Sequence, residues 1–421
     1  MPRSDTGNHS GHSTMASKGF LRQFGPGLLV TAAFIGPGTI TTASSAGANF
    51  GFALLWALLF SLLATVVLQE MASRLGLVTR AGLAEALRDY FSGPILGRGA
   101  VLLVVAAVGV GNAAYEAGNI AGAALALALV SPLGSGQWAL LIGLLAAALL
   151  YSGRYRVLEG TLIVLVLLMS AVFIITAWQV APSLPALLEG LFRPSLPPGS
   201  VMTVIALIGT TVVPYNLFLH ANAVREKWPD TVPTGQALRE SRLDTTLSIG
   251  LGGLITLAIM STAAAAFFGT GLAFTGDSLA VQLEPLLGSW ARQVFAAGLF
   301  AGGLTSAITA PLAAGYAVCG ALGWRCDLRA PGFRLVALLV LLTGTAFAAL
   351  GSQPLAAILF AQVANGFLLP VVAVFLLVVM NQRRLLGDFT NGRRANLLGA
   401  LVVAVAFGLG AVKLAGVFGL L

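Results

Sequence analysis

Long uninterrupted runs of apolar residues dominate the sequence and restrict the chain to a membrane fold. A helix needs roughly 18 or more mainly apolar residues to cross the hydrocarbon core of a bilayer. By that measure we predict eleven spans, at about residues 26–48, 51–73, 99–130, 137–152, 157–179, 201–224, 243–270, 291–322, 333–351, 354–381 and 396–420. Hydrophobic residues make up 57% of the chain and charged residues only 9%, which excludes a set of soluble domains. The predicted fold class is therefore an all-α polytopic membrane protein.

The basic residues predict how these spans are oriented. The 23 Lys and Arg residues lie between the apolar runs and not in one patch, so the net charge of +8 does not indicate nucleic acid as a partner. With a cytoplasmic N-terminus, most of them fall in cytoplasmic segments, as the positive-inside rule requires. We therefore predict a multi-pass protein of the cell inner (plasma) membrane whose C-terminus lies outside. Residues 1–20 are predicted to be a disordered cytoplasmic tail, and residues 80–91 an amphipathic helix in the interface.

Two of the predicted spans are interrupted at their centres by proline. The first contains Gly36-Pro37-Gly38-Thr39, and the sixth contains Val213-Pro214-Tyr215-Asn216. Spans one to five (21–179) and six to ten (200–381) have opposite orientations, so each half begins with a broken helix, and span eleven (396–420) follows. Interrupted helices at corresponding positions of two inverted repeats indicate the substrate site of a secondary transporter. A purely structural kink at each proline is the alternative.

Several stretches resemble one transporter family. FGPGLLVTAAFIGPGTITTASSAGANFGFALLW is similar to the first two helices of the NRAMP family of proton-coupled divalent-metal transporters. GTTVVPYNLFLHA resembles its sixth helix, AGNIAGAALAL its third, and LLGDFTNGRRAN the loop between its tenth and eleventh helices. The resemblance implies a LeuT-type fold, with a 5+5 inverted repeat, an eleventh helix and broken helices one and six. It also implies symport by alternating access. We expect no enzymatic activity, because the sequence shows no nucleophile with a paired base, no His-Glu-x-x-His pattern and no paired intramembrane aspartates.

The metal ligands of that family are missing here. Its first-helix motif is Asp-Pro-Gly-Asn, where this chain has Gly36 and Thr39 in place of the aspartate and asparagine. Its sixth-helix motif is Met-Pro-His, where this chain has Val213 and Tyr215 in place of the methionine and histidine. A divalent ion that leaves water needs several polar ligands, and usually an anionic one. We therefore expect a degraded transition-metal site with no metal ligands of the usual kind.

Three functions remain open on this reasoning. The main prediction is a transporter of a small solute, such as a small organic acid, because helix N-termini at the breaks are positive by dipole. The alternative is a transporter of magnesium or another hard cation, held through carbonyl, hydroxyl and water ligands. A third is a membrane receptor or sensor that uses the same scaffold without transport. Flux in proteoliposomes separates the transporters from the receptor.

The candidate site residues follow from the breaks and from the resemblance. The predicted substrate-binding residues are Gly36, Gly38, Thr39, Ser45, Val213, Tyr215, Asn216 and Gln362. Glu116 is predicted near the middle of a span, and the resemblance places it at a position linked to proton passage. His220 aligns with a histidine of the family's sixth helix, and a histidine in a transporter core can relay protons. Each either carries a coupling proton or is a neutral group bonded to a neighbouring helix. Apart from its substrate and the lipid bilayer we expect no partner, no cofactor and a monomer.

Overall fold

The computed structural model describes residues 35–91, 96–152, 155–351 and 353–417, and within them the regular structure consists of helices joined by loops. The α-helices are α2 (Pro37–Phe50), α3 (Leu55–Thr79), α4 (Leu83–Tyr90), α5 (Leu96–Ala128), α6 (Ser135–Ser152), α7 (Tyr155–Gln179), α8 (Leu184–Phe192), α9 (Val201–Thr211), α10 (Pro214–Lys227), α11 (Thr234–Phe267), α12 (Glu284–Leu287), α13 (Ala291–Leu322), α14 (Pro331–Leu350), α15 (Pro354–Met380), α16 (Arg383–Leu386) and α17 (Arg393–Val417). Three short 3-10 helices join them, η2 (Leu279–Leu283), η3 (Gly288–Trp290) and η4 (Gly387–Phe389).

Ten segments of the described chain are long and apolar enough to cross a membrane, and they correspond to predicted spans two to eleven. Of the predicted first span, residues 26–34 lie outside the described residues, as does the predicted tail at 1–20. The predicted interfacial segment forms the short helix α4. Helix α11 starts at Thr234, well before the predicted residue 243, because a polar helical extension precedes its apolar part. Hydropathy detects only the part of a helix that lies in lipid.

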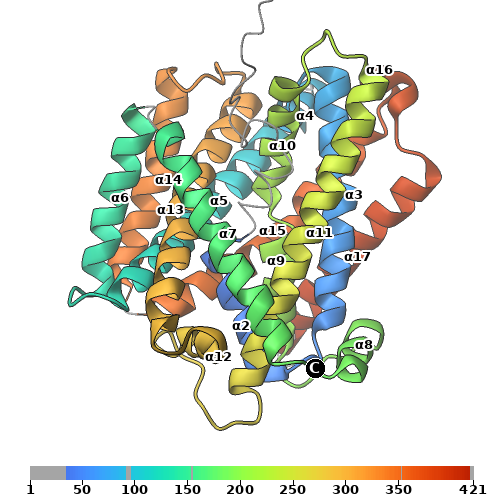
Figure 1. Cartoon of the computed structure of the whole chain (residues 1–421). Coiled ribbons are helices and arrows are strands. Elements are labelled where there is room, and N and C mark those ends of the chain that lie inside the picture. The colour runs from blue at the N-terminus through green and yellow to red at the C-terminus, as the bar shows by residue number, and fades with distance from the viewer. Residues whose placement is uncertain (1–34, 92–95, 153–154, 352, 418–421) are drawn as a thin grey trace, which may run out of the picture.

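The helices form two packed groups with the broken helices between them (Figure 1). Helix α5 packs against α6, α13 and α14 on one side of the molecule, and α11 packs against α2 and α3 on the other. Helix α15 contacts both α5 and α9, so it lies between the groups. The short helices α4 and α16 lie at one end of the bundle, and α8 and α12 lie at the opposite end.

Glycines allow the central helices to touch backbone to backbone. A Cβ atom on Gly209 of α9 would lie 2.1 Å from the Gln362 carbonyl oxygen of α15, and one on Gly47 of α2 would lie 2.2 Å from the Met260 carbonyl oxygen of α11. Lipid tails are as apolar as most side chains, so burial of apolar surface does not drive membrane helices together. Close van der Waals packing does, and small residues allow the backbones to approach. The two glycines therefore fix α9 and α2 closely against their neighbours.

Arg74 ties together three segments at the end of the bundle predicted to be cytoplasmic. Its guanidinium group donates to Glu70 Oε2 at 3.0 Å, to the Phe389 carbonyl oxygen at 2.7 Å and to Asn391 Oδ1 at 2.7 Å. Glu70 also pairs with Arg242 of α11, at 2.8 Å. The Arg74 side chain is only 7% exposed, whereas that of Arg242 is 56% exposed. The network therefore joins α3 and α11 to the loop that precedes α17.

Replacing Arg74 by alanine is expected to lower the free energy of unfolding by about 2–4 kcal/mol, because the change breaks a buried ion pair and leaves two acceptors without their donor. Thermal unfolding in detergent measures the loss. The matched control is Arg242→Ala, which removes an exposed partner of the same Glu70 and should cost about 0–1 kcal/mol. Equal losses in the two variants would contradict a buried anchor at Arg74.

Candidate functional site

The chain is non-helical at Val212 and Val213, between α9 and α10. Helix α9 ends at Thr211, and α10 starts at Pro214 with Val213 in an extended conformation. Helix α2 likewise starts at Pro37, after an extended Gly36. A proline in the first turn of a helix costs little, because the first amide has no intrahelical partner. Both predicted breaks are therefore helix starts, although the segment that precedes Ile35 lies outside the described residues.

A hydrogen bond joins the two breaks directly. Thr39 Oγ1 and Thr210 Oγ1 are 3.0 Å apart, and both side chains are buried. Gln362 of α15 lies against both broken helices: its side-chain amide fills the space beside Gly38, where a Cβ would lie 2.3 Å from Nε2, and its carbonyl oxygen contacts Gly209. Residues far apart in the sequence thus form one polar cluster at the centre of the bundle.

Several polar atoms at the breaks have no hydrogen-bond partner among the described residues. They are both side-chain amide atoms of Asn216, Gln362 Oε1 and Thr42 Oγ1. Asn216 and Gln362 are buried, at 0% and 1% exposure. A buried polar group without a partner costs about 1–3 kcal/mol, so native proteins keep few of them. Such a concentration indicates a site whose ligand or water would supply the missing bonds.

The space at the site is small. A cavity of about 10 Å³ lies beside the threonine pair, lined by Thr39, Leu62, Thr210, Thr211, Ile249, Gly252 and Thr256. That volume is of the order of one water molecule. The site is therefore nearly closed in this conformation, and a larger occupant requires the helices to move apart.

Three other predicted substrate-binding residues, Gly36, Val213 and Ser45, differ in their distance from the breaks and in their contacts. Gly36 caps α2, and α13 approaches it closely, since a Cβ on Gly302 would lie 3.4 Å from the Gly36 Cα. Val213 is buried, and its carbonyl oxygen accepts a hydrogen bond from the backbone N–H of Asn216. Ser45 lies further along α2, where its hydroxyl and carbonyl oxygens accept bonds from Asn49 Nδ2. Ser45 is thus engaged within its own helix.

Glu116 lies near the break between α9 and α10, because the preceding residue, Tyr115, contacts Tyr215. The rings of Tyr115 and Tyr215 meet edge to face with their centroids 5.2 Å apart. The Glu116 side chain is fully buried against Gly344 of α14, and its Oε2 accepts a bond from Asn119 Nδ2 at 3.2 Å. Its Oε1 has no partner among the described residues. Tyr115 was not predicted as a site residue, although it directly precedes the one acidic residue expected at mid-membrane.

His220 lies one helical turn after Asn216 on α10. Its Nε2 is 3.3 Å from Thr245 Oγ1 of α11, and its Nδ1 has no partner in the described part of the chain. Residues four apart share one face of a helix. His220 and Asn216 therefore lie on one side of α10, with His220 further from the break.

Gln282 is a buried polar residue that the sequence analysis missed. It lies on η2, where its side chain bonds Ser44 of α2 at 3.0 Å, accepts from Thr262 of α11 at 3.3 Å and donates to the Leu279 carbonyl oxygen at 2.8 Å. The residue is 0% exposed. A single glutamine in a loop has no sequence signal, because only the folded chain brings η2 over α2. Gln282 closes the end of the bundle opposite α4.

A polar cavity of about 450 Å³ lies near the end of the bundle that carries α4. Its lining is Arg80, Glu85, Asn222, Arg225, Glu226, Pro229, Asp230, Tyr316 and Cys326. Arg80 pairs with Asp230 at 2.6 Å across it. Burial, and then the neighbouring Glu85 carboxylate, raises the pKa of the Cys326 thiol to about 12, so this thiol is protonated and unreactive at neutral pH.

Anionic metal ligands are not gathered at the breaks. Among the described residues, no group of three or more His, Cys, Asp or Glu side chains is placed to hold a metal ion. The polar atoms that converge there are neutral amides and hydroxyls. Such groups suit a hard cation that keeps part of its water shell better than a bare transition metal.

Comparison with known proteins gives one consistent family. Residues 27–416 match the sequence model of the family described as natural resistance-associated macrophage protein-like, Nramp. The "Divalent metal cation transporter MntH" of Aeromonas hydrophila is 29% identical over 409 residues, which cover 95% of this chain and 97% of that protein. A protein of the same description from Klebsiella pneumoniae is 28% identical over 404 residues, or 94% of each chain.

Solved structures show the same fold. A mutant of the manganese transporter of Eremococcus coleocola matches with a TM-score of 0.76 and 23% identity, over 94% of this chain and 87% of that one. Mhp1, a nucleobase-cation-symport-1 family transporter, matches with a TM-score of 0.57 and 12% identity, over 92% of each chain. These likenesses confirm the predicted all-α, LeuT-type fold.

Proposed function

This chain belongs to the Nramp family, and from that premise we propose that it is a secondary active transporter of a hard divalent metal cation such as Mg²⁺. The curated relatives are described as divalent metal cation transporters, which favours the alternative of the sequence analysis over the small organic acid. The prediction of an organic acid as substrate rested on the positive N-terminal ends of α2 and α10. The same cluster also contains the negative C-terminal end of α9.

The observation that carries the proposal is the set of neutral oxygen atoms without partners at the two breaks. Asn216 Oδ1 and Gln362 Oε1 are oxygen ligands, the kind that a hard cation prefers. Neither is charged, so they do not replace the full hydration energy of a divalent ion. Mg²⁺ usually retains several of its waters in proteins. The proposed ion therefore bonds mainly through its own waters to these side chains and to carbonyl groups at the end of α9.

The charge of the ion is balanced by Glu116 in this proposal. Tyr115, which precedes it in the chain, packs edge to face on Tyr215 at the break, so Glu116 lies in the neighbourhood of the proposed ion. Glu116 and His220 are also the proposed carriers of a coupled proton, since each has one polar atom without a partner in the described chain. The transporter would act as a monomer in the inner membrane, with its N-terminus in the cytoplasm.

Flux measurements in proteoliposomes test this function. We expect Mg²⁺ to enter vesicles that contain the protein, with saturation and with competition from Mn²⁺, because a water-mediated site discriminates poorly among hard divalent ions. A pH-sensitive dye in the same vesicles reports protons. Glu116→Gln keeps the size of the side chain and should abolish proton entry driven by the metal, and His220→Gln should reduce it.

Two results would overturn parts of this proposal. Vesicles that take up neither Mg²⁺ nor Mn²⁺ above protein-free controls would exclude a hard divalent cation as the substrate. Proton entry that is unchanged in both variants would remove Glu116 and His220 from the coupling role and leave cation transport standing.

A further inference from the structure

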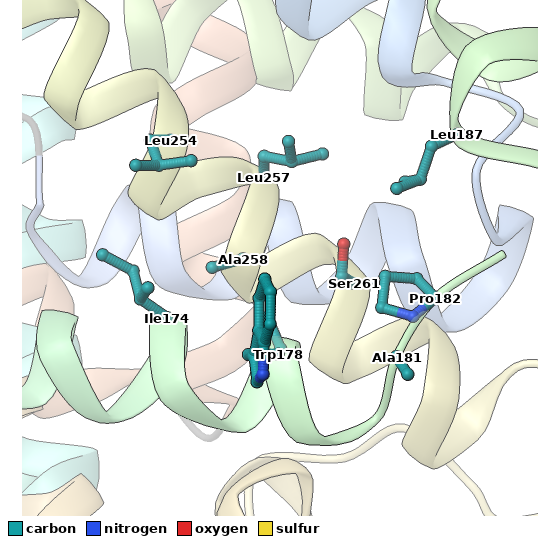
Figure 2. A pocket seen from close by; sticks show the side chains of 10 residues that line it. Ile174, Trp178, Ala181, Pro182, Leu187, Leu254, Leu257, Ala258 and Ser261 are labelled. Atoms are coloured by element: carbon teal, nitrogen blue, oxygen red, sulfur yellow. The ribbon is translucent and has the colours of Figure 1, made fainter. Parts of the chain in front are cut away.

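An apolar groove lies on the membrane-facing side of the bundle, away from the broken helices. It has a volume of about 520 Å³ between α7, the start of α8 and α11. Figure 2 shows its lining side chains, which are Ile174, Ala177, Trp178, Ala181, Pro182, Leu187, Leu254, Leu257, Ala258 and Ser261. Nine of these ten residues are apolar, so water is a poor occupant.

The open side of the groove faces the lipid bilayer. The residues of α7 and α11 that line it belong to two membrane-spanning segments, Gly160–Gln179 and Thr234–Phe267. Trp178 is 85% exposed and Leu254 is 52% exposed at its open side. Side chains of this kind on the outside of a spanning helix face lipid. The occupant of the groove is therefore drawn from the bilayer.

One polar group lies within this apolar lining. Ser261 is 3% exposed, and its hydroxyl makes no hydrogen bond in the described part of the chain. A serine in a helix commonly bonds a carbonyl of the preceding turn. Here the oxygen points away from its helix (Figure 2). The groove thus offers a single hydroxyl donor to an otherwise apolar ligand.

Helix α8 marks the membrane surface at one end of the groove. It carries exposed Leu184, Leu188 and Phe192, and it ends with an exposed Glu189–Arg193 ion pair. Apolar side chains beside charged ones are typical of a helix that lies in the interface. A molecule that extends from this surface into the groove has a polar head at α8 and an apolar tail between α7 and α11.

We propose that this groove binds one acyl chain of a membrane phospholipid, with the Ser261 hydroxyl donating a hydrogen bond to an ester carbonyl oxygen of that lipid. Met260, the residue before Ser261, contacts Gly47 of α2 through its carbonyl oxygen. Helix α2 carries Thr39 of the candidate site. The lipid chain therefore lies against α11, the helix that packs directly on α2.

Native mass spectrometry and photo-crosslinking of the full-length protein test the site. The probe is a phosphatidylethanolamine with a diazirine in one acyl chain, added to detergent-purified protein. We expect one lipid to remain bound and, after illumination, adducts on peptides from α7 and α11. Ala177→Phe fills the groove from α7 and should lower bound lipid by about tenfold, the loss that corresponds to about 1.4 kcal/mol of binding free energy.

Matched variants separate the site from general contact with lipid. Ala171 is exposed on the same helix and does not line the groove, so Ala171→Phe should retain the lipid. Ser261→Ala should lower retention by several-fold without filling the space, and it decides the question if Ala177→Phe does not fold. Retention in Ala177→Phe and Ser261→Ala equal to that of the unaltered protein, or adducts spread evenly over all lipid-facing helices, would overturn the proposal.

Discussion

Replacing Asn216 by leucine is expected to reduce cation transport by about 10- to 100-fold while the fold becomes no less stable. Hydrogen bonds to charged groups contribute about 1.5–3 kcal/mol, and both amide atoms of Asn216 are free to bond a hydrated ion. The same two atoms have no partner in the described chain, so an apolar side chain of similar size should raise the free energy of unfolding by about 1–3 kcal/mol. Vesicle flux and thermal unfolding measure the two effects.

The opposite signs of the two effects distinguish a substrate ligand from a structural residue. Ser45→Ala is the control, because Ser45 is also buried on a broken helix but bonds Asn49 in its own helix. That variant should transport at a rate within a factor of about two of the unaltered protein. An Asn216→Leu protein that loses stability together with transport would assign Asn216 a structural role.

Restoring the family's ligand motifs should convert the site to direct metal coordination. The change combines Gly36→Asp and Thr39→Asn with Val213→Met and Tyr215→His, which recreates Asp-Pro-Gly-Asn and Met-Pro-His. An aspartate tolerates the extended conformation of Gly36, at φ −97° and ψ −177°. A carboxylate and a thioether next to the ion should tighten Mn²⁺ binding by at least about tenfold and make it selective over Mg²⁺. Isothermal titration calorimetry with both metals measures this change.

A neutral variant tests whether charge causes the gain. With Gly36→Asn in place of Gly36→Asp, the other three changes remain and the side chain keeps its size without the negative charge. Its affinity for Mn²⁺ should fall back most of the way to that of the unaltered protein. Equal affinities in the two variants would show that the lost carboxylate is not what separates this site from that of its relatives.

The sequence predicted the helical framework well, because membrane spans depend on local composition. The predicted spans 291–322 and 354–381 match α13 and α15 almost residue for residue. The break at Val213-Pro214 was predicted from its proline and from the matching position of Pro37, whereas proline alone is not sufficient, since Pro311 and Pro370 lie inside α13 and α15. The family resemblance is confirmed, and the boundaries of the two repeats stay a prediction.

Contacts between distant segments were not predictable from the sequence. Thr39 and Thr210 are 171 positions apart, and only the packing of α2 against α9 in the folded chain brings their hydroxyls together. Gln282 lies in a connection with no motif, yet it bonds two spanning helices. The comparisons favour the cation alternative over the predicted organic acid for a related reason. The dipole argument for an organic acid considered two helix N-termini, and it omitted the end of α9 and the neutral oxygens beside it.

Anomalous diffraction from crystals soaked in Mn²⁺ tests the central claim most directly. The proposal predicts one peak between α2 and α10, roughly 4–5 Å from Asn216 Oδ1 and Gln362 Oε1, the separation expected with one water between the ion and each side chain. An Asn216→Leu crystal soaked in the same way should lose that peak. The absence of any peak at the breaks in the unaltered protein at saturating Mn²⁺, or a peak bound elsewhere by carboxylates alone, would contradict the account.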